Sequence, residues 1–296
     1  MKKYVSIDIG GTAIKYGIIC ADGGILVHKE MPTEAHKGGA SILEKAAQIT
    51  RQLLKEHTIS GICISTAGIV DTKKGAILYA APLIPGYTGV CLKESLEKQF
   101  QIPCEVENDV NCAGLSEYLS GAGCGFDPML MLTVGTGIGG CLVTGRQLYR
   151  GVSYSACEVG YLRMRGSDFQ TLGSASSLCR RVSENKHEPL DDWNGRRIFD
   201  AAAHGDRICI HAIDEMVDIL GLGIANLCYV LNPGAVILGG GIMAQESYLS
   251  ERIEKAVRFY LLEHIASAVR IAFAKHKNHA GMLGAFYHFK ACHPDS

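Results

Sequence analysis

Apolar residues recur along the first half of the chain with the periods of short strands and amphipathic helices. Three strands are expected at residues 4–9, 14–19 and 25–28, separated by the turns GGT and ADGG. A helix over residues 40–56, with its apolar residues on one stripe, follows them. The half continues with a strand at 61–65, a helix at 89–100, a strand at 104–107 and a helix from 109 or 110 onward.

The same order of elements returns in the second half of the chain. Strands are expected at 129–134, 140–144 and 147–149, followed by several helices, of which the longest spans residues 207–231. The last predicted elements are a strand at 235–238, a helix at 245–264, a strand at 269–273 and a helix at 281–289. Two α/β halves of this order in tandem are typical of the duplicated actin-like (ribonuclease H-like) ATPase architecture, in which a nucleotide lies in a central cleft.

The duplication divides the chain into two expected lobes. The N-terminal α/β lobe spans residues 1–117 and is completed by the C-terminal helix at residues 281–296. The C-terminal α/β lobe spans residues 118–280. Because one fold hosts many activities, the function has to be read from the motifs.

Composition restricts the classes of protein that this chain can be. Apolar residues make up 47% and charged residues 20% of the 296 residues, as in folded globular proteins. The 29 basic and 30 acidic residues leave a net charge of −1, so no overall field favours nucleic acid or an acidic membrane as main partner. The 12 cysteines are scattered without a CxxC pair, and no apolar run approaches a membrane span, so we expect reduced thiols and a cytoplasmic location.

The first glycine turn, in DIGGT, is a candidate phosphate site at the end of the first strand. Gly10 and Gly11 allow backbone N–H groups to approach a polyphosphate, Thr12 adds a donor, and Asp8 can orient hydrated magnesium. Taken alone, the motif is explained more simply as a hairpin turn with a capping hydroxyl.

Two further glycine turns stand at corresponding places in the second half. In VGTGIGG, Gly135, Thr136 and Gly137 are expected to face a γ-phosphate, and in ILGGGI the backbone at Gly240 and Gly241 can pass close to an adenine or ribose. VGTGIGG also satisfies G-x-G-x-x-G, which would favour a nucleotide-dependent dehydrogenase, but that pattern must open a helix and a strand follows here. Three such turns at corresponding strand ends together predict one ATP-binding cleft.

The sequence VENDVN offers a catalytic base between a strand and a helix. Asn108 and Asp109 are both good N-caps, which is the simpler explanation of the motif. Opposite a phosphate cradle, an ionised Asp109 can instead accept the proton of an attacking hydroxyl, and phosphoryl transfer requires little else from a side chain. Asn108 suits vicinal sugar hydroxyls as donor and acceptor, and Glu158 can grip a pair of hydroxyls, although a single Glu is usually a surface residue.

Together these motifs resemble the ROK family of sugar kinases. The resemblance rests on DIGGT, STAGIVD, VENDVN, LTVGTGIGG, LYRGVSYSACEVGYL and ILGGGI, which cover nearly the whole chain in the family's order. It implies an ATP- and magnesium-dependent kinase for the 6-hydroxyl of a hexose, with Asp109 as base, Asn108 and Glu158 on sugar hydroxyls, and the backbone near Gly68 assisting. It also implies a homodimer. Family repressors carry an additional N-terminal helix-turn-helix domain, whereas this chain enters its first strand at Tyr4, so DNA binding is disfavoured.

The chain departs from the family pattern at two places near the expected sugar. Tyr161 stands where most bacterial members have His, and residues 162–177 contain no Cys or His, so the family's structural zinc site cannot form. Gln170 corresponds to a second sugar-binding Glu. An amide relaxes the demand for a free anomeric hydroxyl, so the substrate is expected to be a β-glucoside, N-acetylmannosamine or glucose. Alternatively, Tyr161 and Gln170 only pack a zinc-free segment.

A protein of another class can carry the same motifs. A sugar-sensing regulator would retain the fold without turnover, but the intact Asp109 and both phosphate loops favour an enzyme.

Trp193 lies next to Asp191 and Asp192, and it is expected on a surface segment without a role.

Overall fold

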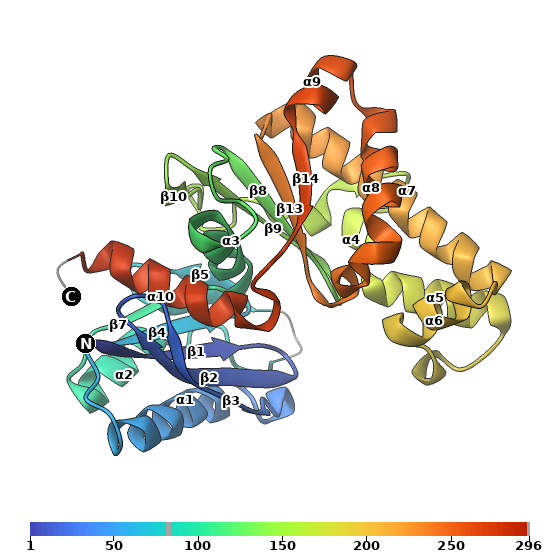
Figure 1. Ribbon diagram of the computed structural model, residues 1–296. Helices are drawn as coiled ribbons and strands as arrows, with labels where there is room; N and C mark the ends of the chain where they lie inside the picture. The colour runs from blue at the N-terminus through green and yellow to red at the C-terminus, as the bar shows by residue number, and fades with distance from the viewer. Residues whose placement is uncertain (81–83, 295–296) are drawn as a thin grey trace. The chain divides into compact units, whose positions relative to one another are not determined.

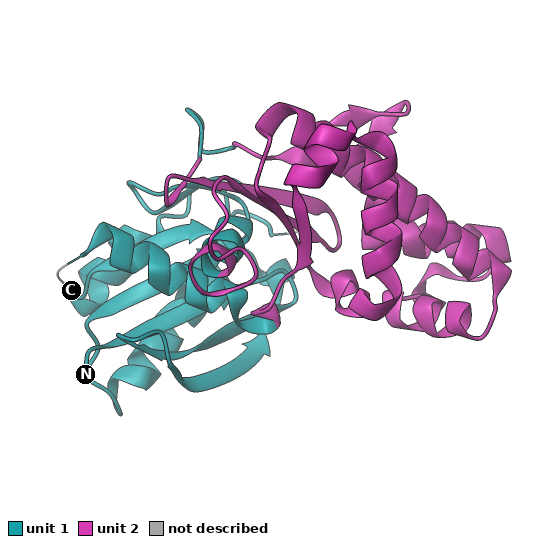
Figure 2. Ribbon diagram, turned by 45° about the horizontal axis from the view of Figure 1, so that its top comes forward, with its two compact units in different colours: residues 1–116, 150–155, 278–296 teal, residues 117–149, 156–277 magenta. Residues whose placement is uncertain are grey.

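The computed structural model describes residues 1–80 and 84–294 (Figure 1). The chain folds into two compact units, which Figure 2 distinguishes by colour. The first unit comprises residues 1–116, 150–155 and 278–296, and the second comprises residues 117–149 and 156–277. The short segment 150–155 and the C-terminal helix therefore belong to the N-terminal unit.

The first unit is built on a five-stranded sheet in the order β3-β2-β1-β4-β7. β1, β2 and β3 form antiparallel hairpins, whereas β4 and β7 continue the sheet in parallel with β1. The strands are β1 (Lys3–Ile9), β2 (Ala13–Cys20), β3 (Ile25–Pro32), β4 (Gly61–Thr66) and β7 (Cys104–Asn108). β4 is buried throughout, as expected of a central strand covered on both faces.

Helices cover the two faces of this sheet. α1 (Gly39–Leu54) and α2 (Leu92–Phe100) share an apolar cluster with Val5 of β1. α10 (Ala280–Cys292) and the first part of α3 (Asp109–Ser120) share another cluster with Tyr4. Successive side chains of a strand point to opposite faces, so the neighbours Tyr4 and Val5 separate the two clusters.

The second unit repeats this topology in a sheet of order β10-β9-β8-β13-β14. β8, β9 and β10 are antiparallel, and β13 and β14 run parallel to β8. The strands are β8 (Met129–Val134), β9 (Ile138–Thr144), β10 (Gln147–Leu148), β13 (Ala235–Gly239) and β14 (Arg270–Phe273). Both sheets thus contain three antiparallel strands followed by two parallel ones, and the predicted duplicated actin-like fold is confirmed.

The long helix α7 (Arg207–Leu231) lies in the core of the second unit and has the predicted bounds. It packs against α4, α5, α6 and α8. These helices are α4 (Phe169–Gly173), α5 (Ala175–Lys186), α6 (Gly195–Ala203) and α8 (Glu246–Tyr260). No helix of the described residues is both long and apolar enough to cross a membrane.

Shorter elements complete the chain. Two small hairpins are formed by β5 (Ile69–Asp71) with β6 (Ala76–Tyr79) and by β11 (Arg163–Met164) with β12 (Ser167–Asp168). The 3-10 helices are η1 (Ala35–Lys37), η2 (Val159–Tyr161), η3 (Leu190–Asp192), η4 (Gly241–Gln245) and η5 (Lys277–His279). The sequence pattern did not predict either hairpin, because strands of two to four residues are too short to show a period.

Two sequence-based expectations are wrong. The helix predicted over residues 245–264 is interrupted, since α8 ends at Tyr260 and α9 (Glu263–Ala268) begins three residues later. Leu261 between them has extended backbone angles and is buried in the apolar core. Trp193, expected on the surface, is 7% exposed and packs in the core of the second unit.

Candidate active site

Asp8 lies close to the carboxyl end of β1, beside the first glycine turn. Its Oδ1 accepts a hydrogen bond of 2.6 Å from Ser65 Oγ, which stands directly opposite on the parallel strand β4. Burial raises the pKa of the Asp8 carboxyl, against the lowering effects of Ser65 and of the Lys15 charge. At the start of α10, a Cβ on Gly281 would lie 2.3 Å from Asp8 Cγ, so only glycine allows the helix to approach this carboxylate.

The turn after β1 is anchored by a hydrogen bond at Gly10 and exposed at its next two residues. Thr33 Oγ1 donates a 2.6 Å hydrogen bond to the carbonyl of Gly10, while Gly11 and Thr12 are exposed. A Cβ on Gly11 would meet nothing within 4 Å. The exposed part of the turn can therefore admit an anion at its backbone.

Asn108 and Asp109 join the end of β7 to the start of α3. Asn108 Oδ1 accepts hydrogen bonds from the backbone N–H groups of Val110 and Asn111, at 2.9 and 3.0 Å, so Asn108 caps the helix. Its Nδ2 donates to Asp109 Oδ1 at 3.0 Å and to the carbonyl of Gly68 at 2.9 Å. Asn108 therefore caps α3 and also fixes Asp109 and the loop after β4 through its side-chain amide.

Gly68 occupies a backbone conformation that other residues avoid. Its φ is +100°, and a Cβ would lie 2.6 Å from the carbonyl oxygen of Tyr79. Across the sheet, Thr66 of β4 is paired with Ile9 of β1 and with Asn108 of β7. The three predicted motifs of the first unit therefore meet at the carboxyl ends of three adjacent parallel strands, where α/β folds place their sites.

Glu107 and Arg150 form an ion pair that positions the Asn108–Asp109 segment. The sequence analysis identified neither residue. Glu107 is 1% exposed, and its Oε2 lies 2.6 Å from Arg150 Nη2 and 2.7 Å from Arg150 Nε. Its Oε1 accepts hydrogen bonds from the backbone N–H of Asn108 at 2.8 Å and from Asn111 Nδ2 at 2.9 Å. The available signal was a carboxylate placed directly before the Asn-Asp pair, but its partner is 43 residues away.

The remaining sugar candidates lie in the second unit. Glu158 precedes η2, which ends at Tyr161, and Gln170 is on α4. The Gln170 Oε1 atom lies 2.6 Å from the position that a Cβ on Gly137 would take, and 2.8 Å from the corresponding position on Gly160. Gln170 therefore contacts both the GTG loop (residues 135–137) and the segment that follows Glu158.

Glu158 and Tyr161 both reach solvent, and the Tyr161 side chain is 59% exposed. The surrounding protein nevertheless desolvates the Glu158 carboxyl and raises its pKa. Downstream of Tyr161, the hairpin of β11 and β12 leads directly into α4, and this stretch holds no Cys or His ligands.

A pocket of about 830 Å³ opens in the second unit. It brings together parts of both glycine turns of this unit, since Gly135, Thr136 and Gly241 line it. Gly137 and Gly240 are not among its lining residues. Gly240 instead has φ of +96° and passes so close to Val134 that a Cβ would lie 2.3 Å from its carbonyl oxygen.

The other walls of this pocket come from residues to which the sequence analysis assigned no role, Trp193 among them. The N-termini of α5 and α6 supply Ala175, Ser176, Gly195 and Arg196, and the positive end of a helix dipole attracts anions. Trp193, Leu190 and Ile242 supply apolar surface. The Trp193 ring lies 4.3 Å from the Arg197 guanidinium carbon, and its Nε1 donates to Glu188 Oε2 at 3.0 Å. Apolar walls and two helix N-termini suit a nucleotide, which combines a flat base with phosphates.

Comparison with known proteins identifies relatives along nearly the whole chain. The model of the ROK family matches residues 4–291. A β-glucoside kinase of Listeria monocytogenes is 33% identical over 97% of this chain and 97% of its own length. The solved structure of a proposed N-acetylmannosamine kinase from the same organism is 32% identical, with a TM-score of 0.87 over 98% of this chain and 99% of its own. A ROK glucokinase of Streptomyces griseus, solved with glucose and AMPPNP, is 27% identical, with a TM-score of 0.84 over 96% of this chain and 97% of its own.

Proposed function

Because the chain belongs to the ROK family and its relatives include sugar kinases, we propose that it transfers the γ-phosphoryl group of ATP to the 6-hydroxyl of a hexose or hexose derivative. The observation that carries this proposal is the arrangement of Asn108 around Asp109. One amide caps α3, holds the Gly68 carbonyl and donates to the Asp109 carboxylate. A carboxylate fixed in this way at the end of a strand is suited to act as a general base.

In the proposed reaction, Asp109 accepts the proton of the sugar hydroxyl as its oxygen bonds to the γ-phosphorus. The bond between that phosphorus and the bridging oxygen of ADP breaks, and its electron pair leaves with ADP. Little covalent chemistry is demanded of the protein, so positioning and charge stabilisation dominate. Asn108 and Glu158 are proposed to orient the sugar hydroxyls.

The pocket of the second unit supports the ATP assignment. It offers backbone at Gly135, Thr136 and Gly241, two helix N-termini for phosphates and the Trp193 surface for a base. Gly10, Gly11 and Thr12 of the first unit are proposed to bind phosphate from their own turn, in keeping with the exposure of Gly11 and Thr12.

Magnesium fits the Asp8 site by its donor chemistry. The ligand offered is a carboxylate oxygen, which Mg²⁺ prefers, and it lies beside the exposed Gly11 and Thr12 of the first glycine turn. We propose that Asp8 holds the ion through water. When bound with ATP, the ion would neutralise phosphate charge.

The sugar is proposed to be a β-glucoside, with N-acetylmannosamine and glucose as the other candidates. The support is Gln170, whose amide lies against Gly137 and Gly160 and can donate as well as accept a hydrogen bond. A substituted anomeric oxygen can accept from this amide, whereas a carboxylate could not donate to it. Tyr161 is exposed enough to stack on a second sugar ring.

An ADP-release assay with glucose, N-acetylmannosamine and a β-linked glucose disaccharide tests this function. The proposal expects ATP- and Mg²⁺-dependent turnover with at least one of the three, and the highest kcat/KM with the disaccharide. Preference for glucose or N-acetylmannosamine would contradict the β-glucoside assignment alone. Binding of sugars without any turnover would instead favour a sugar-sensing regulator.

We also propose a homodimer that acts in the cytoplasm. Val230 and Phe259 are each 80% exposed and Leu262 is 66% exposed, around the ends of α7 and α8. Tyr229 Oη joins these ends, because it accepts from the Leu262 N–H at 2.9 Å and donates to the Tyr260 carbonyl at 3.1 Å. Large exposed apolar side chains in one place mark an interface. Light scattering should give a dimer mass for the native chain and a monomer mass for Phe259→Asp, and a monomeric native chain would contradict the proposal.

The cytoplasmic location is supported by the thiols. No disulfide joins cysteines of the described residues, and six of the 12 cysteines are buried. Buried reduced thiols are typical of proteins in a reducing compartment.

A further inference from the structure

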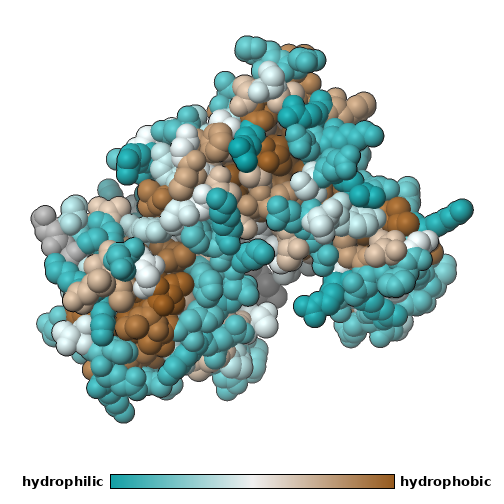
Figure 3. Space-filling model, in the orientation of Figure 1, coloured by the Kyte–Doolittle hydropathy of each residue, from teal (hydrophilic) through white to brown (hydrophobic). Residues whose placement is uncertain are grey.

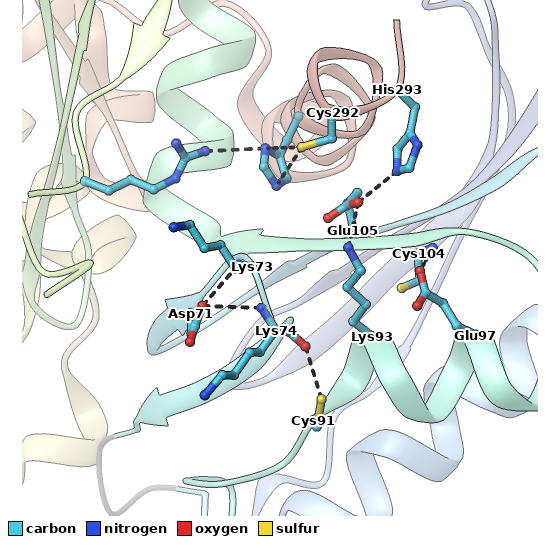
Figure 4. A network of polar contacts seen from close by, with 12 residues as sticks. Asp71, Lys73, Lys74, Cys91, Lys93, Glu97, Cys104, Glu105, Cys292 and His293 are labelled. Atoms are coloured by element: carbon cyan, nitrogen blue, oxygen red, sulfur yellow. Dashed lines mark hydrogen bonds and ion pairs between the residues drawn. The ribbon is translucent and has the colours of Figure 1, made fainter. Parts of the chain in front are cut away.

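Four side chains that can bind a metal ion gather between the last helix and the sheet of the first unit, apart from the residues assigned to the kinase reaction. His288 and Cys292 are four residues apart on α10, so they share one face of the helix. Glu105 extends from β7 beneath them, and His293 follows the helix (Figure 4). The ligand atoms of Glu105, His288 and Cys292 all lie within 4.8 Å of one another.

The distances in this cluster are close to those of a metal centre. Cys292 Sγ lies 3.9 Å from the ring nitrogens of His288. Bond lengths of about 2.3 Å to sulfur and 2.1 Å to nitrogen at a tetrahedral angle place these two atoms about 3.6 Å apart. His293 Nε2 lies 2.8 Å from Glu105 Oε1. The separation of the first pair therefore exceeds that expected of two zinc ligands by only a few tenths of an ångström.

We propose that Glu105, His288 and Cys292 form a binding site for Zn²⁺ or a similar divalent transition metal, with a fourth position for water or His293. Thiolate, imidazole and carboxylate together are a ligand set that such ions prefer over magnesium or calcium. The site is distinct from the zinc site that the segment 162–177 lacks. Cys292 is exposed, which gives an ion access from solvent.

The protonation states suit exchangeable binding. Burial lowers the pKa of His288, so its imidazole is neutral and able to ligate at neutral pH. Cysteine binds such ions as the thiolate, so an incoming ion must displace the thiol proton of Cys292.

Two neighbouring cations limit the affinity of this site. Lys93 Nζ lies 2.7 Å from Glu105 Oε1, and Arg150 Nη2 lies 3.4 Å from His288 Nδ1. Lys93 and His293 compensate the buried Glu105 carboxylate without any metal. The fold therefore does not depend on the ion, and a chelator should remove it without unfolding the protein.

Titration of the full chain with Zn²⁺ alone, and then with Co²⁺ as a spectroscopic probe, tests the site. We expect one zinc ion per chain and a thiolate-to-cobalt charge-transfer band. Cys292→Ser should abolish the band and weaken zinc binding by at least about 10- to 100-fold, the scale of losing a supporting group at a metal site. Cys124→Ser is the matched control, because Cys124 is also exposed but lies in the second unit.

Alkylation read by mass spectrometry gives an independent measurement. Zinc should protect Cys292 from alkylation and leave Cys124 as reactive as before. Glu105→Gln should weaken zinc binding over the same range as Cys292→Ser. Equal zinc affinity of the native chain and Cys292→Ser, absence of the cobalt–thiolate band, or equal alkylation of Cys292 with and without zinc would each overturn the proposal. None of these readouts requires kinase activity, so they are separate from the test of the proposed function.

Discussion

Arg150 forms an ion pair with Glu107, in which Nη2 lies 2.6 Å from Oε2. The other carboxylate oxygen of Glu107 accepts hydrogen bonds from the backbone N–H of Asn108 and from the side-chain amide of Asn111. The carboxylate is 1% exposed, whereas the arginine side chain is 25% exposed. The segment that carries Asp109 is therefore built on a buried charge whose partner comes from residues 150–155.

Replacement of this arginine tests its positioning role. Arg150→Met should lower the free energy of unfolding by about 3 kcal/mol, since it leaves Glu107 buried without its cation. It should also lower kcat by up to about 100-fold, because Asn108 and Asp109 lose their support, with a smaller change in KM. Urea unfolding and steady-state kinetics measure the two effects.

Two further variants separate positioning from general damage. Addition of Glu107→Gln to Arg150→Met removes the unpaired charge and should restore part of the stability. Arg252→Met breaks an exposed ion pair with Asp214 in the second unit and should change neither quantity appreciably. Unchanged kcat in Arg150→Met would contradict the positioning role.

Asp109→Asn tests the proposed base directly. The amide is nearly isosteric and can still accept the hydrogen bond from Asn108, so fold and sugar binding should persist. It cannot take a proton from the sugar hydroxyl, and kcat should fall by roughly 10²- to 10⁴-fold. Calorimetry of sugar binding and the ADP-release assay check this, and turnover close to that of the native enzyme would remove Asp109 from the mechanism.

Trp193 provides a reporter for the nucleotide pocket, because it is the single tryptophan of the chain and lines that pocket. AMPPNP should change its fluorescence in a saturable manner without sugar present. Trp193→Phe should abolish the signal and keep the fold. If saturating nucleotide left the emission of an active enzyme unchanged, the base would have to bind elsewhere.

Local signals explain what the sequence predicts well. DIGGT, VENDVN and the GTG loop each combine a strand end with residues suited to a turn or cap. Their places in the fold therefore follow from a few neighbouring residues. The partnership of Glu107 with Arg150 and the burial of Trp193 depend on packing between distant segments, and no local period reports it. The gathering of Glu105, His288 and Cys292 is of the same kind, since only the packing of α10 on the sheet brings His288 and Cys292 to Glu105.

Asp8 should make stability depend on pH in a direction opposite to that of an ion-paired aspartate. Burial raises its pKa above 3.8, so the unfolded chain releases the proton at a lower pH than the native protein does. As pH rises above about 4 and through the native pKa, the native state comes to carry a buried charge that the unfolded chain carries in water, and stability falls. Asp8→Asn should remove this loss, so that urea unfolding at pH 7 shows a more stable protein and a flatter profile between pH 4 and 8.

The same variant should lose Mg²⁺-dependent turnover, because the amide is a poorer ligand for a hydrated cation. Asp22→Asn, at an exposed turn of the same unit, is the matched control and should change neither property. A variant at Asp8 that was less stable than the native chain at pH 7 would show that the Ser65 hydrogen bond outweighs the cost of burial.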